Sequence, residues 1–156
     1  MGWRMPGKAN SEYSIAHASI SQRAAPVTWL VRAAIVILYP RTDRMPGAED
    51  CDLDAFLERF RSETTVLMWL GVVVGALLFH LTPIFTVYVP LPAFMLPPGL
   101  ADRHADRIGS TNIYLVRQLV SVLKIPAGLV WGADPEVRKR FAMPPLAADP
   151  GTWRTK

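Results

Sequence analysis

The chain has 156 residues, of which 17 are basic and 13 acidic, giving a formal net charge of +4. The basic residues are not gathered with aromatic ones into a nucleic-acid-binding patch, so no nucleic-acid partner is expected, and the modest excess suits anionic lipid headgroups. The single cysteine excludes an internal disulfide framework and a cysteine-based zinc site.

The first 23 residues are polar, show no hydrophobic periodicity and are predicted to form an extended N-terminal arm. Residues 24–63 are predicted to form interfacial and amphipathic helices. Pro26 suits the first turn of the first of these helices and Pro40 stops it. This apolar segment carries Arg32 in its middle and is short for a bilayer crossing, so we expect an interfacial or partner-bound helix, and a second membrane span is the alternative.

A second helix is expected after Asp52, which can cap it. Its apolar residues recur at the spacing of a single helical stripe: Leu53, Phe56, Leu57 and Phe60. Arg59 and Arg61 lie on the other face and are candidates for contact with a membrane surface.

Residues 64–89 are the most apolar part of the chain. From Thr64 to Leu96 there is no Asp, Glu, Lys or Arg. A helix needs about 20 apolar residues to cross a bilayer because each residue rises only about 1.5 Å. Trp69 and Tyr88 lie near the two ends, where aromatic rings favour the headgroup level. The sequence therefore predicts one transmembrane helix over 64–89.

Two features within this predicted span suggest contacts. Gly71 and Gly75 have the small-xxx-small spacing that lets two helices approach closely, which predicts a neighbouring helix without identifying it. His80 is the only ionisable side chain of the span, and its functional interpretation is a cofactor-binding residue, as haem ligand, proton relay or quinone contact. The alternative, which we favour, is a neutral histidine bonded to a nearby carbonyl, particularly one released by Pro83.

Residues 90–109 are predicted to form an extended, proline-rich strap because closely spaced prolines interrupt regular helices. The strap is apolar and needs covering by a partner or by lipid. Its expected interface residues are Pro90, Pro92, Phe94, Met95 and Leu96.

Residues 110–156 are predicted to form amphipathic helices and a tail. Ser110 or Thr111 can cap a helix that ends before Pro126, and Asp134 is expected to start another with a proline in its first turn. Three basic residues near the end of that helix can touch phosphates: Arg138, Lys139 and Arg140.

The predicted fold class is therefore mainly α, with a single transmembrane helix, short amphipathic helices, proline-rich extended segments and no independent globular core. Basic residues are balanced on the two sides of the span. The proximity of Arg59 and Arg61 favours a cytoplasmic N-terminus, and a bacterial inner membrane is the expected location.

Two stretches resemble known proteins. LYPRTDRMPGAEDCDLDAFLERF is similar in pattern to small accessory subunits of flavin dehydrogenases of the gluconate dehydrogenase type. LVSVLKIPAGLVWGADPEVRKRFAMPP resembles a segment of membrane-associated glucose-methanol-choline oxidoreductases. The flavin-binding GxGxxG motif is absent, so the resemblance implies that the flavin belongs to another polypeptide, which this chain anchors or covers.

These observations favour a non-catalytic, single-span subunit of a larger membrane complex, such as an oxidoreductase, with no cofactor of its own and with lipid contacts. No catalytic residue or metal ligand is assigned. Two alternatives stay open: an intramembrane carrier that binds haem or quinone through His80, and a peripheral lipid-binding module in which residues 64–96 form a hairpin that does not cross.

Overall fold

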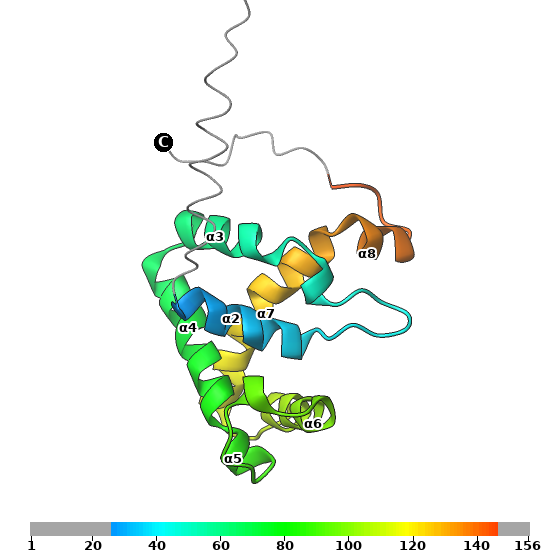
Figure 1. Ribbon diagram of the computed structural model, residues 1–156. Coiled ribbons are helices and arrows are strands. Elements are labelled where there is room, and N and C mark those ends of the chain that lie inside the picture. Colours follow the sequence, from blue (N-terminus) through cyan, green and yellow to red (C-terminus); the bar gives the residue numbers. More distant parts are fainter. Residues whose placement is uncertain (1–25, 147–156) are drawn as a thin grey trace, which may run out of the picture.

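The computed structural model describes residues 26–146, and these residues are 72% helical without strands (Figure 1). The expectation of a mainly α protein is confirmed. The predicted arm over residues 1–23 and the last part of the predicted tail, residues 147–156, lie outside the described residues.

The helices follow one another with short connections. In chain order they are α2 (Pro26–Leu38), η1 (Ala48–Asp50), α3 (Leu53–Glu63), α4 (Val66–Leu81), α5 (Pro83–Thr86), η2 (Ala93–Met95), α6 (Pro98–Gly109), α7 (Tyr114–Ala133) and α8 (Pro135–Arg140).

The centre of the fold is the pair formed by α4 and α7, which pack more extensively than any other two elements. Two glycines of α4 face α7. A methyl group placed on Gly75 would lie 2.8 Å from the backbone oxygen of Leu119, and one on Gly71 would lie 3.4 Å from Cγ1 of Val122. The predicted neighbouring helix of the glycine pair is therefore α7 of the same chain.

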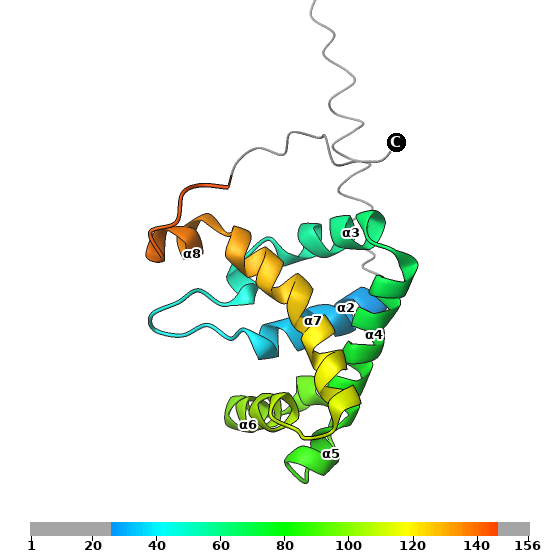
Figure 2. The same cartoon turned by 180° about the vertical axis from the view of Figure 1, so that it is seen from behind.

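The remaining helices pack around this pair (Figures 1 and 2). α2 lies across it and contacts both α4 and α7, while α3 lies at the N-terminal end of α4 and contacts α2 and α7. Arg32 of α2 forms an ion pair with Asp54 of α3 at 3.1 Å, so its charge is paired within the protein. α5 and α6 close the opposite end.

One hydrophobic cluster runs through the described residues and receives side chains from α2, α3, α4, α6 and α7. Its largest members include Ile35, Leu57, Phe79, Ile108 and Leu123, all less than 2% exposed. The expectation that the chain lacks a core of its own is not confirmed.

The predicted transmembrane helix is wrong in its length. α4 has 16 residues, or about 24 Å, against a hydrocarbon core of about 30 Å. Thr82 ends it because Pro83 cannot donate the next helical hydrogen bond, and a separate turn, α5, follows. The chain then reverses at Tyr88, whose φ of 59° is in the left-handed region.

The predicted strap over residues 90–109 is only partly extended. Residues 98–109 form α6, because Pro98 occupies the first helical position, where the missing N–H costs no bond. Within the strap proper, Leu96 is buried by the protein itself and Phe94 packs on Trp29 of α2, with ring centroids 5.0 Å apart. Met95 stays exposed.

The C-terminal half contains a longer helix than expected. α7 continues through the buried Pro126 to Ala133, so the predicted end before this proline is wrong. Packing on α2, α4 and α6 stabilises the helix beyond what its local sequence favours. The predicted start of α8 is confirmed: Asp134 accepts hydrogen bonds from the backbone of Glu136 and Val137 at 2.9 and 3.1 Å.

Within residues 26–146, α7 is the one helix that is long and apolar enough to cross a membrane. Its exposed positions combine polar residues (Arg117, Gln118, Ser121 and Lys124) with apolar ones (Leu115, Ile125 and Leu129). Length and composition alone therefore do not assign α7 to a membrane.

The close approach of α4 and α7 gives a stability prediction. Gly75→Ala should lower the free energy of unfolding by about 1–3 kcal/mol, because the added methyl group meets the rigid backbone of Leu119. Gly71→Ala is the matched control: its methyl group meets only the Val122 side chain, and the gain in helix propensity of about 1 kcal/mol offsets that contact. Denaturant unfolding followed by circular dichroism measures both. Equal stability of the two variants would contradict the described packing.

Candidate functional site

His80, the sequence candidate for cofactor binding, lies on the buried side of α4 with 2% of its surface exposed. Its Nε2–H donates to the backbone oxygen of Leu30 in α2 at 2.9 Å. Phe79 and Phe94 pack edge-on to the ring, with centroids 5.8 and 5.3 Å away. The bond from Nε2 to Leu30 agrees with the favoured interpretation, a neutral histidine bonded to a nearby carbonyl.

The second ring nitrogen of His80, Nδ1, is buried without a hydrogen-bond partner. Since Nε2 donates to a carbonyl, Nδ1 carries a lone pair. An unsatisfied buried acceptor costs about 1–3 kcal/mol. It is the one feature of His80 that fits ligand binding.

A second buried histidine, His104 of α6, was not singled out from the sequence. Its ring is fully buried and completes hydrogen bonds at both nitrogens. Nε2–H donates to the backbone oxygen of Phe79 at 2.8 Å, and the hydroxyl of Thr86 donates to Nδ1 at 2.5 Å. His104 thus connects α6 to both α4 and α5.

Pro83 explains why the backbone oxygen of Phe79 accepts a hydrogen bond from His104. In a continuous helix the carbonyl of Phe79 would accept the N–H of the residue four positions later, which is Pro83 and has none. His104 supplies a donor to this carbonyl, which otherwise has only the Thr82 hydroxyl at 3.4 Å, and Arg107 donates to the backbone oxygen of Thr86 one turn along α6. A proline four residues after a buried helical position is the sequence pattern that predicts a side-chain donor, although it does not say which one. His104, not His80, takes this role.

Burial lowers the pKa of both histidines, and the backbone hydrogen bonds to Leu30 and Phe79 oppose this in part. The neighbouring His80 lowers the pKa of His104 further. Both rings are therefore neutral near pH 7, each with its proton on Nε2.

The cysteine is partly buried, in surroundings that suppress its reactivity. Burial raises the pKa of the Cys51 thiol to about 11, and the nearby carboxylates of Asp134 and Asp50 add to this effect. A cavity of about 240 Å³ lies beside it between α3 and the start of α8. The protonated thiol is a poor nucleophile and metal ligand. Among residues 26–146 no three His, Cys, Asp or Glu side chains gather as a metal site.

The five predicted membrane-surface cations have different surroundings. Arg59, Arg61 and Lys139 are exposed. Arg138 instead holds the turn after α8, donating to the oxygens of Pro144 and Gly132, and Arg140 donates to the oxygen of Arg44.

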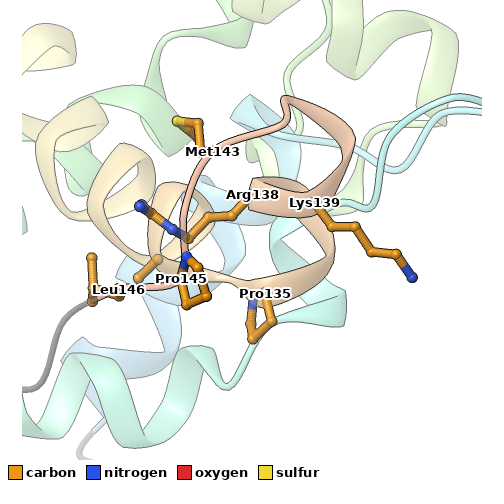
Figure 3. A pocket seen from close by; sticks show the side chains of 7 residues that line it. Pro135, Arg138, Lys139, Met143, Pro145 and Leu146 are labelled. Atoms are coloured by element: carbon orange, nitrogen blue, oxygen red, sulfur yellow. The ribbon is translucent and has the colours of Figure 1, made fainter.

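Figure 3 shows side chains that line a hollow between the end of α7, α8 and the segment after it. Its volume is about 420 Å³. Its lining is mostly apolar, including Pro135, Met143 and Leu146, while the Lys139 side chain points away from the other labelled residues. The cavity offers a shallow apolar hollow rather than a set of reactive groups.

Within residues 26–146, the outer side of α4 exposes a set of aliphatic side chains, which we call the apolar face. Its members are aliphatic and 40–85% exposed: Val66, Leu67, Leu70, Val74, Leu77 and Leu81. From Leu67 on they recur every three or four residues, and Val66 lies on the same side one turn before Leu70, so they form one stripe. Exposed Ile84, Phe85 and Tyr88 follow it. α4 lies at one edge of the molecule, with α8 and the charged loop between α2 and α3 at the opposite edge (Figures 1 and 2).

No family model matches this chain, and no curated protein or solved structure matches it either. The likeness to flavin dehydrogenase subunits stays a prediction from the sequence.

Replacing His104 tests the bond that joins α6 to the end of α4. His104→Ala should lower the free energy of unfolding by about 3–5 kcal/mol, because it leaves a cavity and leaves the carbonyl of Phe79 with only the long contact of the Thr82 hydroxyl at 3.4 Å. His104→Gln should lower it less, since its amide can reach the same oxygen. Chemical denaturation measures the difference. An alanine variant as stable as the glutamine variant would show that this hydrogen bond contributes nothing.

Stability should also depend on pH. The two lowered pKa values mean that the folded protein binds fewer protons than the unfolded chain in acid. The histidines therefore contribute fully to the free energy of unfolding above the unfolded histidine pKa of about 6.5. This contribution is lost as the pH falls through the lowered pKa values of the folded protein. The slope is at most about 1.4 kcal/mol per pH unit for each histidine.

Unfolding curves at several pH values between about 7 and 5 measure this slope. His104→Gln removes one titrating group and should make the slope shallower. An unchanged slope in this variant would contradict a lowered pKa for His104 in the folded protein.

Proposed function

We propose that this protein is a non-catalytic accessory subunit that attaches to a membrane and stabilises a larger membrane complex. The observation that carries the proposal is the apolar face of α4, which presents no polar side chain. Keeping such a surface in water costs about 25 cal/mol per Å² of apolar area. Contiguous exposed apolar patches mark sites of protein or membrane contact.

A second exposed group supports a protein partner. The N-terminal end of α7 presents Ile113, Tyr114 and Leu115, which are 63–70% exposed, next to the exposed Arg117 and Gln118. We call these five residues the partner surface. Tyrosine and arginine beside aliphatic side chains are typical of protein interfaces, where they contribute most of the binding energy.

The resemblance to accessory subunits of flavin dehydrogenases suggests the class of the complex, an oxidoreductase whose flavin is held by the partner. The two histidines within residues 26–146, His80 and His104, support an accessory role, because three of their four ring nitrogens bond to this chain's own helices. α4 is too short to cross, so the proposal attaches the chain to a membrane, such as a bacterial inner membrane, without a crossing by α4.

A second candidate function uses the Nδ1 lone pair of His80 as a ligand to haem or as an acceptor for a quinol hydroxyl. Binding would require Phe94 to move away from the ring, since His80 is almost fully covered. A Soret band in the purified protein that is lost in His80→Leu would support this function over the subunit proposal.

The subunit proposal predicts a stoichiometric complex. Tagged full-length protein, purified from its native membrane in mild detergent, should elute with a larger polypeptide at a fixed ratio, well above its own 17.3 kDa. Tyr114→Ala with Arg117→Ala should lower recovery of that polypeptide at least about tenfold, because each replaces an exposed interface side chain.

Leu70→Gln with Leu77→Gln, on the apolar face, is the matched control and should retain the polypeptide in detergent. Size-exclusion chromatography with light scattering measures the ratio. A monodisperse monomer recovered alone, or a complex indifferent to the Tyr114 variant, would overturn the assigned partner surface.

A further inference from the structure

We infer that α4 lies in the plane of one bilayer leaflet, with its apolar face against lipid acyl chains. The inference rests on the proposed function for the presence of a membrane, and it names lipid as the occupant of this face. The partner protein is assigned to α7 instead.

The chemistry of the face distinguishes lipid from protein. All six members are valine or leucine, and none of them can form a side-chain hydrogen bond. A typical protein interface forms about one hydrogen bond per 100–200 Å² and favours tyrosine, tryptophan, methionine and arginine. Acyl chains require neither hydrogen bonds nor shape complementarity, so a purely aliphatic stripe suits them.

The small residues of α4 point to the same occupant. Helices that associate within a membrane approach through glycine, alanine or serine. Gly71 and Gly75 face α7, and Ala76 is fully buried, so these small residues are already used inside the protein. The outer side offers only branched side chains, which keep another backbone at a distance.

The ends of the face carry charges that complement lipid phosphates. The exposed Arg59 and Arg61 lie in α3 just before α4, and the exposed Arg103 and Arg107 lie in α6, which packs on α5. Basic residues at both ends of an apolar helix lying in the interface can reach headgroups. Asp102 and Asp106 share α6 with those arginines. Attachment therefore depends mainly on apolar insertion, and anionic lipid should strengthen it only a few-fold.

Tyr88 fits an interface at the end of the apolar stretch. It adopts φ 59°, a conformation that favours glycine, while its ring is 80% exposed. Packing within the protein does not account for an aromatic side chain here. A tyrosine at the headgroup level, with its ring in the apolar layer and its hydroxyl in water, does.

Vesicle flotation tests the inference with the full-length protein after detergent removal. The protein should float with vesicles of phosphatidylcholine alone, and a few-fold more strongly when phosphatidylglycerol is added. Leu70→Gln with Leu77→Gln should lower the partition coefficient at least about tenfold, because two inserted leucines are lost. The control, Tyr114→Ala with Arg117→Ala, should float like the wild type.

Orientation is measured with nitroxide labels at residues 67, 74 and 81, one at a time, in the Cys51→Ser background. In-plane insertion predicts that all three labels are accessible to oxygen, shielded from a water-soluble relaxation agent and at similar depths. A steady change of depth from 67 to 81 would show a crossing helix and overturn the inference. Labels buried only against a second copy of the chain would also overturn it.

The two proposals fail separately. Loss of flotation in the wild type with an intact complex in detergent would remove the lipid assignment and leave the subunit. If the chain has no protein partner but floats in a way that depends on Leu70 and Leu77, the subunit proposal fails and the lipid assignment stands.

Discussion

The contact between α4 and α7 at Gly75 determines how the rest of the molecule is arranged. A side chain at this position would collide with the backbone of Leu119, so the glycine lets the two helices approach closely. Once this side of α4 is fixed against α7, the opposite side must face outward. The glycines of α4 face α7, and Phe79 and His80 are buried on the inner side of the helix, so the aliphatic stripe is left exposed on the outer side.

The length of that stripe is set at the other end by Pro83 and His104. The proline ends α4 after 16 residues and frees the carbonyl of Phe79, and His104 of α6 bonds that carbonyl. α6 is thereby joined to the end of α4, and its Arg107 donates to the backbone oxygen of Thr86 in α5. A helix too short to cross a bilayer, with charged helices at both ends, suits attachment along a membrane surface.

Local chemistry in the sequence predicted several elements correctly. The stripe beginning at Leu53 forms α3, Pro26 begins α2, and Asp134 caps α8 through its carboxylate. The glycine pair predicted a helix contact, though not that α7 of the same chain provides it. For these three helices the physical reason lies in neighbouring residues, whereas the partner of the glycine pair depends on residues more than forty positions later.

The errors arose where residues distant in the sequence determine the ends of a helix. Hydropathy made residues 64–89 a single helix, whereas the end of α4 is stabilised by a histidine more than twenty residues later. Prolines predicted an extended segment and an early helix end, but Pro98 begins α6 and Pro126 lies inside α7, held by packing on α2 and α4. His104 lies at helical spacing with the apolar Ala101 and Ile108, which places it on the inner side of α6, but the charged residues around it hid this pattern.

The most direct test of the account is photo-crosslinking from the apolar face in the native membrane. Benzoylphenylalanine in place of Val74 reports the neighbour of that face, and in place of Gln118 it reports the neighbour of the partner surface. Mass spectrometry should find phospholipid adducts at residue 74 and a polypeptide adduct at residue 118. A polypeptide adduct at residue 74, from a partner or from a second copy, would contradict the assignment of this face to lipid.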